Sequence, residues 1–244
     1  MKNMWLIILF FSFLIFYSGC DNNDNITESP TGYYWGGNVL LWTENGSTID
    51  DRSGVKIYLE GTNYHTFTDQ QGNWKIYNIP AGIYSLVAKK EGFGYHKFIH
   101  FEYNGNTNNN NFGQTLIATP TYHIDSVSLS NSNGDILLTG FPSNVVSNLR
   151  FVLIYLGKQD PIYDSTTTWD FIIESQIYGG NDFFTVNFNN SFLMNNGYAN
   201  GDTVHIAVYP GSRIVERYFV LEEYKLINSS GVGPNPKRFN YVIP

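Results

Sequence analysis

Hydrophobic and polar residues alternate along much of this chain with a period of two. In residues 55–60, Val55, Ile57 and Leu59 share one face, and residues 74–76 repeat the alternation. Such a period predicts strands that bury one face each. The strands expected in the first half lie at 39–42, 55–60, 74–76, 84–88, 95–103 and 112–119.

The segments between these strands are rich in Gly, Asn and Asp, as at 44–46, 51–54, 69–72 and 80–82. These residues favour turns because they tolerate a positive φ or bond to their own backbone. Short strands joined by such turns predict a β-sandwich. In it, Tyr84, Leu86 and Ala88 face the core, and 69–72 forms a hairpin turn.

A second series of strands follows the low-complexity loop 104–111, and Pro120 stands at the boundary. Its expected members are 124–129, 135–139, 149–156, 183–188, 203–209, 218–227 and 239–243. The predicted fold class is therefore all-β, with two β-sandwich domains in series at 33–119 and 120–244.

Several spaced elements of the first half carry a family resemblance. They are Gly54-Val55, Thr68-Asp69 with Gly72-Asn73-Trp74, Ile79-Pro80-Ala81-Gly82 and Lys90-Glu91-Gly92-Phe93. In this order they resemble the carboxypeptidase regulatory-like domain, a transthyretin-like sandwich. The resemblance implies an accessory module without catalytic residues. The strand pattern of the second half is similar to fibronectin type III and other immunoglobulin-like domains.

The N-terminus has the features of an export signal. Lys2 precedes an apolar run at 5–17 and then Ser18-Gly19-Cys20. Thirteen residues rise only about 20 Å as a helix, which is short of a bilayer core of ~30 Å. Residues 17–20 resemble the lipobox of bacterial lipoproteins, although Tyr17 replaces the usual Leu. The resemblance implies a signal peptide at 1–19, a lipidated Cys20 and a tether at 20–32; the alternative is a plain secretory signal.

Composition narrows the function classes. The 244 residues carry a formal net charge of −7, which argues against nucleic-acid binding because that affinity comes mainly from Lys and Arg. The single Cys excludes an intramolecular disulfide and a cysteine metal cluster. We expect no cofactor and no metal.

Few side chains form a recognisable chemical constellation. His96, His100 and Glu102 would share one face of a strand, where the two His residues lie about 13 Å apart, too far for one metal ion. We expect exposed strand histidines. Residues 131–135 read as a hairpin turn rather than a calcium loop. The adjacent acids Asp50 and Asp51 read as solvated turn residues.

Aromatic residues, 17% of the chain, suggest a binding role. Trp35, Trp42, Trp169 and Tyr178 are candidate ligand-binding residues, because flat rings stack on sugars and anchor protein interfaces. The alternative is that they fill sandwich cores and edges. Separately, Ser126, Ser165 and Thr203 follow Asp and precede Val, Thr and Val. These strings resemble the acceptor motif of a bacterial O-glycosylation system.

Taken together, these features predict an exported lipoprotein that is not an enzyme. We expect an accessory or adhesion-type binding module, attached to a membrane by its lipid and facing a glycan or a surface-protein partner. The alternatives are a glycan-binding component of a carbohydrate-uptake assembly and a hydrolase with an unrecognised site. Asp21 is compatible with inner-membrane retention or surface export, and we favour the outer membrane or cell surface.

Overall fold

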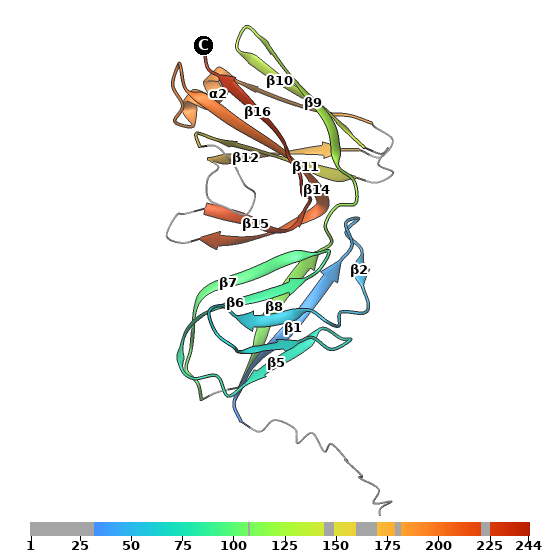
Figure 1. Ribbon diagram of the computed structural model, residues 1–244, viewed down its shortest axis with the longest axis vertical. Helices are drawn as coiled ribbons and strands as arrows, with labels where there is room; N and C mark the ends of the chain where they lie inside the picture. The colour runs from blue at the N-terminus through green and yellow to red at the C-terminus, as the bar shows by residue number, and fades with distance from the viewer. Residues whose placement is uncertain (1–31, 107, 144–148, 160–169, 179–181, 221–224) are drawn as a thin grey trace, which may run out of the picture. The chain divides into compact units, whose positions relative to one another are not determined.

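A computed structural model describes residues 32–106, 108–143, 149–159, 170–178, 182–220 and 225–244. Within these ranges the chain is built almost entirely of strands, with one short helix, α2 (Asn190–Asn195) (Figure 1). The predicted all-β sandwich fold is confirmed. In the same ranges, no helix has the length and apolar character that crossing a membrane requires.

The first sandwich consists of two four-stranded sheets. In one, β1 pairs antiparallel with β2 and β5 and parallel with β8. The other has the antiparallel order β4-β3-β6-β7. The strands are β1 (Tyr34–Trp42), β2 (Thr48–Ile49), β3 (Lys56–Leu59), β4 (His65–Phe67), β5 (Asn73–Tyr77), β6 (Gly82–Lys90), β7 (Gly94–Tyr103) and β8 (Asn109–Ile117).

The alternation of residues 55–60 correctly predicts which of these side chains belong to the first core. Val55, Ile57 and Leu59 are fully buried, and they belong to one cluster with Leu86 and Ala88. Tyr84 packs against the same cluster. At about 25 cal/mol for each Å² of apolar surface, this burial is the main force that holds the two sheets face to face.

The turn at residues 69–72 forms as predicted but does not make a hairpin. Oδ1 of Asp69 accepts hydrogen bonds from the backbone N–H of Gln71 and of Asn73, and Gly72 has a φ of +85°. However, β4 and β5, which flank the turn, belong to different sheets. The turn is therefore a corner that carries the chain from one layer to the other.

The second sandwich pairs a three-stranded sheet with a five-stranded one. The smaller, here called sheet C, has the order β13-β10-β9; the larger, sheet D, has the order β12-β11-β14-β15, with β16 also paired to β14 (Figure 1). The strands are β9 (Ile124–Ser132), β10 (Asp135–Pro142), β11 (Arg150–Gly157), β12 (Phe171–Ile177), β13 (Phe184–Asn189), β14 (Thr203–Val220), β15 (Lys225–Val232) and β16 (Lys237–Val242).

Two predicted segments differ from the structure, and some elements were not predicted. The strand expected at 218–227 is instead the end of β14 and the start of β15, which pair with each other. Residues 109–111, expected in a loop, already belong to β8. The strands β2, β4 and β12 and the helix α2 were not predicted. The helix is only six residues long, and the side chain of Asn189 caps it by accepting from the N–H of Phe192 at 2.8 Å.

The second core lies between sheets C and D. It includes Ile136 and Leu138 of β10 and Val152 and Ile154 of β11, all fully buried. Gly140 makes room for a large side chain: a Cβ there would lie 2.2 Å from the ring of Phe184 on the paired strand. Phe184 therefore covers the backbone of β10 on the core side, and the neighbouring positions of both strands face outward.

Polar contacts join the β1–β2 loop to the start of the second strand series. Oε1 of Glu44 accepts from Nη2 of Arg150 at 3.0 Å and from the hydroxyl of Thr121 at 2.9 Å. Next to them, the hydroxyl of Tyr122 donates to the carbonyl of Phe151 at 2.6 Å. Burial raises the pKa of Tyr122 far above its ordinary value, so the hydroxyl remains a donor.

Candidate functional site

The outer face of sheet C exposes apolar side chains. Phe141 on β10 is 44% exposed, Phe183 just before β13 is 45% exposed, and Leu137 is 41% exposed. The rings of Phe141 and Phe183 lie 6.5 Å apart between centroids, at an angle of 46°. Contact between water and two large apolar rings is unfavourable, and a ligand that covers the rings removes it. This pair therefore marks a candidate binding surface.

Hydroxyl and amide side chains share this surface with the rings. Thr139 of β10 lies in register between Ser128 of β9 and Thr185 of β13. One row along, Leu137 lies between Ser130 and Asn187. Residues directly opposite each other on paired strands project from the same face. We call this surface, made of Ser126, Ser128, Ser130, Leu137, Thr139, Phe141, Phe183, Thr185 and Asn187, the Phe141–Phe183 face.

The Phe141–Phe183 face carries no ionisable side chain among its nine residues. Ionisable side chains lie at its margins: exposed Asp135 is two residues before Leu137 on the same side of β10, exposed Asp182 directly precedes Phe183, and Nε2 of exposed His123 is 2.9 Å from Oδ1 of Asp125. Hydroxyl and amide groups can both donate and accept hydrogen bonds. The face is therefore suited to a ligand that is uncharged and rich in hydroxyl groups, or to another uncharged surface.

Of the four predicted aromatic ligand residues, Trp35 is in the wrong place for that role. Its side chain is fully buried in the first core, stacked on Tyr103 with ring centroids 5.6 Å apart and packed edge-on against Phe112. A ring enclosed in this way cannot stack on a ligand. Trp35 is instead a core residue, which was the alternative reading of these aromatics.

The other three candidates have mixed positions. Trp42, the last residue of β1, is only half-buried, but its Nε1 is buried and has no hydrogen-bond partner among the described residues. Tyr178 follows β12 and is 61% exposed, as a binding residue requires. Trp169 lies outside the described residues.

The predicted glycosylation sites can be placed in part. Ser126 is exposed on β9, directly opposite Phe141. Thr203 is half-buried at the start of β14, and Ser165 lies outside the described residues, as does the predicted lipidation site Cys20. Glycosylation at these positions stays a prediction.

A bulge in β7 changes the arrangement expected for His96, His100 and Glu102. The pairing with β6 shifts between Tyr84 and Leu86, and His100 has a φ of +52°. Side chains after the bulge change face, so Phe98 and Phe101 both pack on the first core. His100 is exposed as predicted.

His96, by contrast, is not an exposed histidine. It lies on the core side of β7, with its ring 4.9 Å from that of Phe98, and burial lowers its pKa. The expectation that residues 96, 100 and 102 share a face is therefore wrong. In the described residues, no group of three or more His, Cys, Asp or Glu side chains is arranged to hold a metal ion.

The two remaining turn predictions agree with the structure. Asn133 and Gly134, both with positive φ, form the two-residue turn between β9 and β10, which is a hairpin. Asp50 and Asp51 are both exposed. Hydrogen bonds from Ser53 lower the pKa of Asp51, so this carboxylate caps its own turn.

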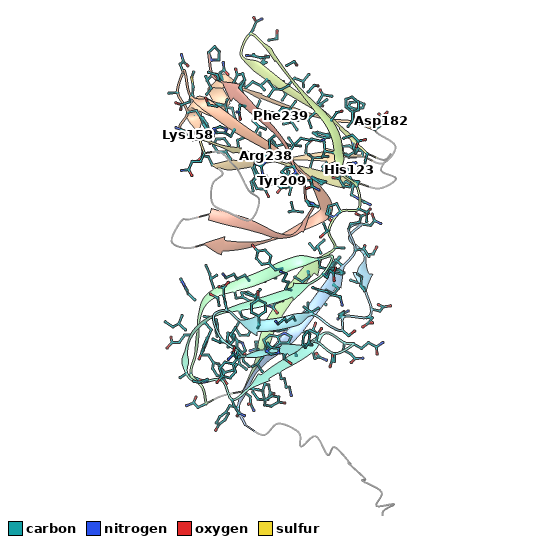
Figure 2. The ribbon with its side chains drawn as sticks, in the orientation of Figure 1. His123, Lys158, Asp182, Tyr209, Arg238 and Phe239 are labelled. Carbon is teal, nitrogen blue, oxygen red and sulfur yellow. The ribbon has the colours of Figure 1, made fainter. Side chains whose placement is uncertain are left out.

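A second feature is a hollow of about 550 Å³ on sheet D. Its lining includes Tyr209 of β14, Arg238 of β16, the turn at 233–236 and Thr119. Figure 2 labels Tyr209 and Arg238 side by side, and Nη2 of Arg238 donates to the hydroxyl of Tyr209 at 3.5 Å. Sequence reasoning identified neither residue.

No protein-family model matches this chain, and no curated protein does. Among solved structures, a DUF3823 family protein from Bacteroides ovatus is 16% identical, with a TM-score of 0.31, over 88% of this chain and 100% of the other. A proposed carbohydrate-binding protein from Bacteroides uniformis is 9% identical, with a TM-score of 0.33, over the same shares.

A mutant cohesin–X–dockerin complex from Acetivibrio cellulolyticus is also similar. The match has 16% identity and a TM-score of 0.31, and it covers 36% of this chain. The present chain spans 59% of the length of that protein. All of these TM-scores are below 0.5, so none of the likenesses indicates what this protein binds.

Proposed function

We propose that this protein is a non-enzymatic binding module, held at a bacterial membrane through lipid on Cys20, and that it binds an uncharged glycan on the Phe141–Phe183 face. The observation that carries the binding proposal is the combination of two exposed rings with rows of hydroxyl and amide side chains. Sugar rings present both C–H faces and hydroxyl groups, so a receptor needs both kinds of contact.

The rings have enough free area to support binding. A Phe side chain can bury roughly 150–250 Å², so the 44–45% that remains exposed corresponds to about 90 Å² for each ring. At about 25 cal/mol for each Å², covering one ring is worth about 2 kcal/mol. Loss of either ring should therefore weaken binding by at least about tenfold, which corresponds to 1.4 kcal/mol.

The position of the face on a sheet supports the same role. Leu137 and Thr139 are held by the pairing of β10 with both β9 and β13, and Phe141 is paired with Ser126 of β9. Their backbone therefore does not need to be ordered when a ligand arrives, which removes part of the entropy cost of association.

Affinity electrophoresis in gels that contain an uncharged polysaccharide tests the proposal. A panel of starch, mannan, xylan and mixed-linkage glucan would be screened with the chain from Asp21 onward and with the F141A/F183A double variant. We expect one polysaccharide to retard the unsubstituted chain and the double variant to lose that retardation. Phe67→Ala is the matched control, because Phe67 is 57% exposed but lies on β4 of the first sandwich.

Two outcomes would contradict the glycan proposal. One is equal retardation of the double variant and the unsubstituted chain, which would place the sugar site elsewhere. The other is the absence of retardation in every gel, which would favour the adhesion-type alternative, in which the same rings contact a protein surface.

A further inference from the structure

The outer face of the β4-β3-β6-β7 sheet in the first sandwich places two lysines directly opposite each other. They are Lys56 of β3 and Lys89 of β6, and both are exposed. Phe67 of β4 is opposite Lys56 on its other side, and one row along, His65 of β4 is opposite Tyr58 of β3. Residues in register on paired strands project from one face. We call these five residues the Lys56–Lys89 face.

The two ammonium groups have no acidic partner among the described residues. Neither lysine forms an ion pair there, whereas Nζ of Lys97 on β7 is 2.6 Å from Oε2 of Glu60. Nζ of Lys56 lies 5.5 Å from the centroid of the Tyr58 ring, which leaves its charge in place. Like charges directly opposite each other on paired strands are destabilising. An anion that covers the pair would relieve this repulsion.

Around the two lysines, the Lys56–Lys89 face is aromatic rather than acidic. Phe67 is 57% exposed, and His65 packs edge-on against it, with ring centroids 6.2 Å apart. Asp69 and Glu91 lie outside the face, in the turns two residues after Phe67 and Lys89. Basic groups next to an exposed apolar ring suit a boundary at which phosphate groups cover hydrocarbon.

Charge is distributed unevenly along the chain. Residues 33–119 contain six Lys or Arg and seven Asp or Glu, so the first sandwich is nearly neutral. Residues 120–244 contain seven Lys or Arg against eleven Asp or Glu. An anionic surface therefore repels the first sandwich less than the second.

We infer that the Lys56–Lys89 face docks on the phosphate headgroups of an anionic bilayer. The inference rests on the proposed function for the lipid on Cys20. Gly32, the first described residue, is twelve residues after Cys20, which is at most about 40 Å of extended chain. A linker of this length holds the first sandwich at an effective concentration of about millimolar at the bilayer, so a weak contact is sufficient.

Each residue of the face has a defined part in this contact. A lysine close to an anionic lipid surface strengthens binding about fivefold. The long side chains of Lys56 and Lys89 reach the phosphates, and the Phe67 ring enters the boundary between headgroups and acyl chains.

Lysine footprinting of the chain from Cys20 onward, coupled to vesicles, tests the inference. The single thiol, that of Cys20, is joined to a maleimide lipid, so the result does not depend on lipidation in the cell. Peptide mass spectrometry measures the acetylation rate of each lysine on vesicles of phosphatidylcholine, and on vesicles with equal amounts of phosphatidylcholine and phosphatidylglycerol. We expect Lys56 and Lys89 to react at least about fivefold more slowly on the anionic vesicles. Lys75, which is exposed on β5 of the other sheet, should react equally on both.

Single variants assign the protection to the face. Lys56→Gln and Phe67→Ala should each restore the acetylation of Lys89 to its rate on phosphatidylcholine. Lys75→Gln is the matched control, because it removes the same charge from an exposed position on the other sheet and should leave Lys89 protected. Salt at about 1 M should abolish the protection, since it reduces the Debye length to ~3 Å.

Four outcomes would overturn the inference. They are equal rates on the two kinds of vesicle, loss of protection in Lys75→Gln, full protection in Lys56→Gln, and protection by soluble polygalacturonate but not by anionic vesicles. The last would make an acidic polysaccharide the partner. The F141A/F183A variant should keep the protection, because the two faces share no residue. Failure of the glycan proposal and failure of membrane docking can therefore be told apart.

Discussion

The buried ion pair between Glu44 and Arg150 should contribute strongly to stability. Their side chains are only 16% and 6% exposed, and Nη2 of Arg150 lies 3.0 Å from Oε1 of Glu44. The perturbations are Arg150→Met, Glu44→Gln and the two together. Each single change leaves one partner behind in a site that water reaches poorly.

Removing one member of a buried pair costs about 3–5 kcal/mol, because the remaining charge keeps its desolvation penalty. Glu44 retains the hydroxyl of Thr121 as a donor at 2.9 Å, so we place Arg150→Met near the lower end, at about 3 kcal/mol. Glu44→Gln leaves a nearly enclosed guanidinium facing a neutral amide, with a comparable cost. The double variant carries neither charge, so its loss should be smaller than the sum of the two single losses by about 1–3 kcal/mol.

Urea unfolding of the chain from Asp21 onward, followed by tryptophan fluorescence, measures these free energies. Lys97→Met is the comparison, because Lys97 and Glu60 are 2.6 Å apart but 21% and 52% exposed, and exposed pairs contribute about 0–1 kcal/mol. Losses below about 1 kcal/mol in both single variants, or strictly additive losses in the double variant, would refute the reasoning.

Four further predictions follow from single residues. The pKa of half-buried His96 lies below its ordinary value of 6.5, because partial burial disfavours the charged ring. The free energy of unfolding should therefore fall as pH drops below 6.5, and urea midpoints should show a smaller fall in His96→Gln. Gln114→Met should raise stability by about 1 kcal/mol in urea unfolding, because the buried Gln114 amide has no partner among the described residues. Clickable palmitate should label the cellular protein but not Cys20→Ser, and labelling of both or neither would contradict the anchor. An intact mass without added hexose would exclude O-glycosylation of Ser126.

The sequence pattern was sufficient to predict which side chains are buried where polar and apolar residues alternate clearly. Val55, Ile57 and Leu59 alternate with polar or amphipathic neighbours, and all three are buried. The pattern failed at Trp35, because the preceding Tyr33 and Tyr34 are also aromatic and no contrast marks the buried face. Tyr33 is in fact 53% exposed, whereas Trp35 is fully enclosed.

The candidate sites could not be predicted for two physical reasons. Ile136, Leu137 and Leu138 form an apolar run in β10, so the sequence does not show that Leu137 points outward; Phe141 is apolar too, yet it is 44% exposed. One signal was nevertheless present. The serines at alternate positions of β9 indicate that this side of β9 is exposed, and Leu137, Thr139 and Phe141 of β10 lie directly opposite them. The hollow depends on contacts between distant strands, as does the Glu44–Arg150 bond, which spans 106 residues.

The parallel pairing of β1 with β8 has a consequence for the order of folding. Trp35 is opposite Asn109, more than seventy residues later, and β8 supplies Phe112 and Leu116 to the core around that tryptophan. Such a pairing gives the first sandwich a high contact order, and closing so long a loop is entropically unfavourable until its last strand exists. During synthesis, one edge of β1 therefore remains unpaired until β8 has left the ribosome. A fragment that ends at Gly105 should remain unfolded.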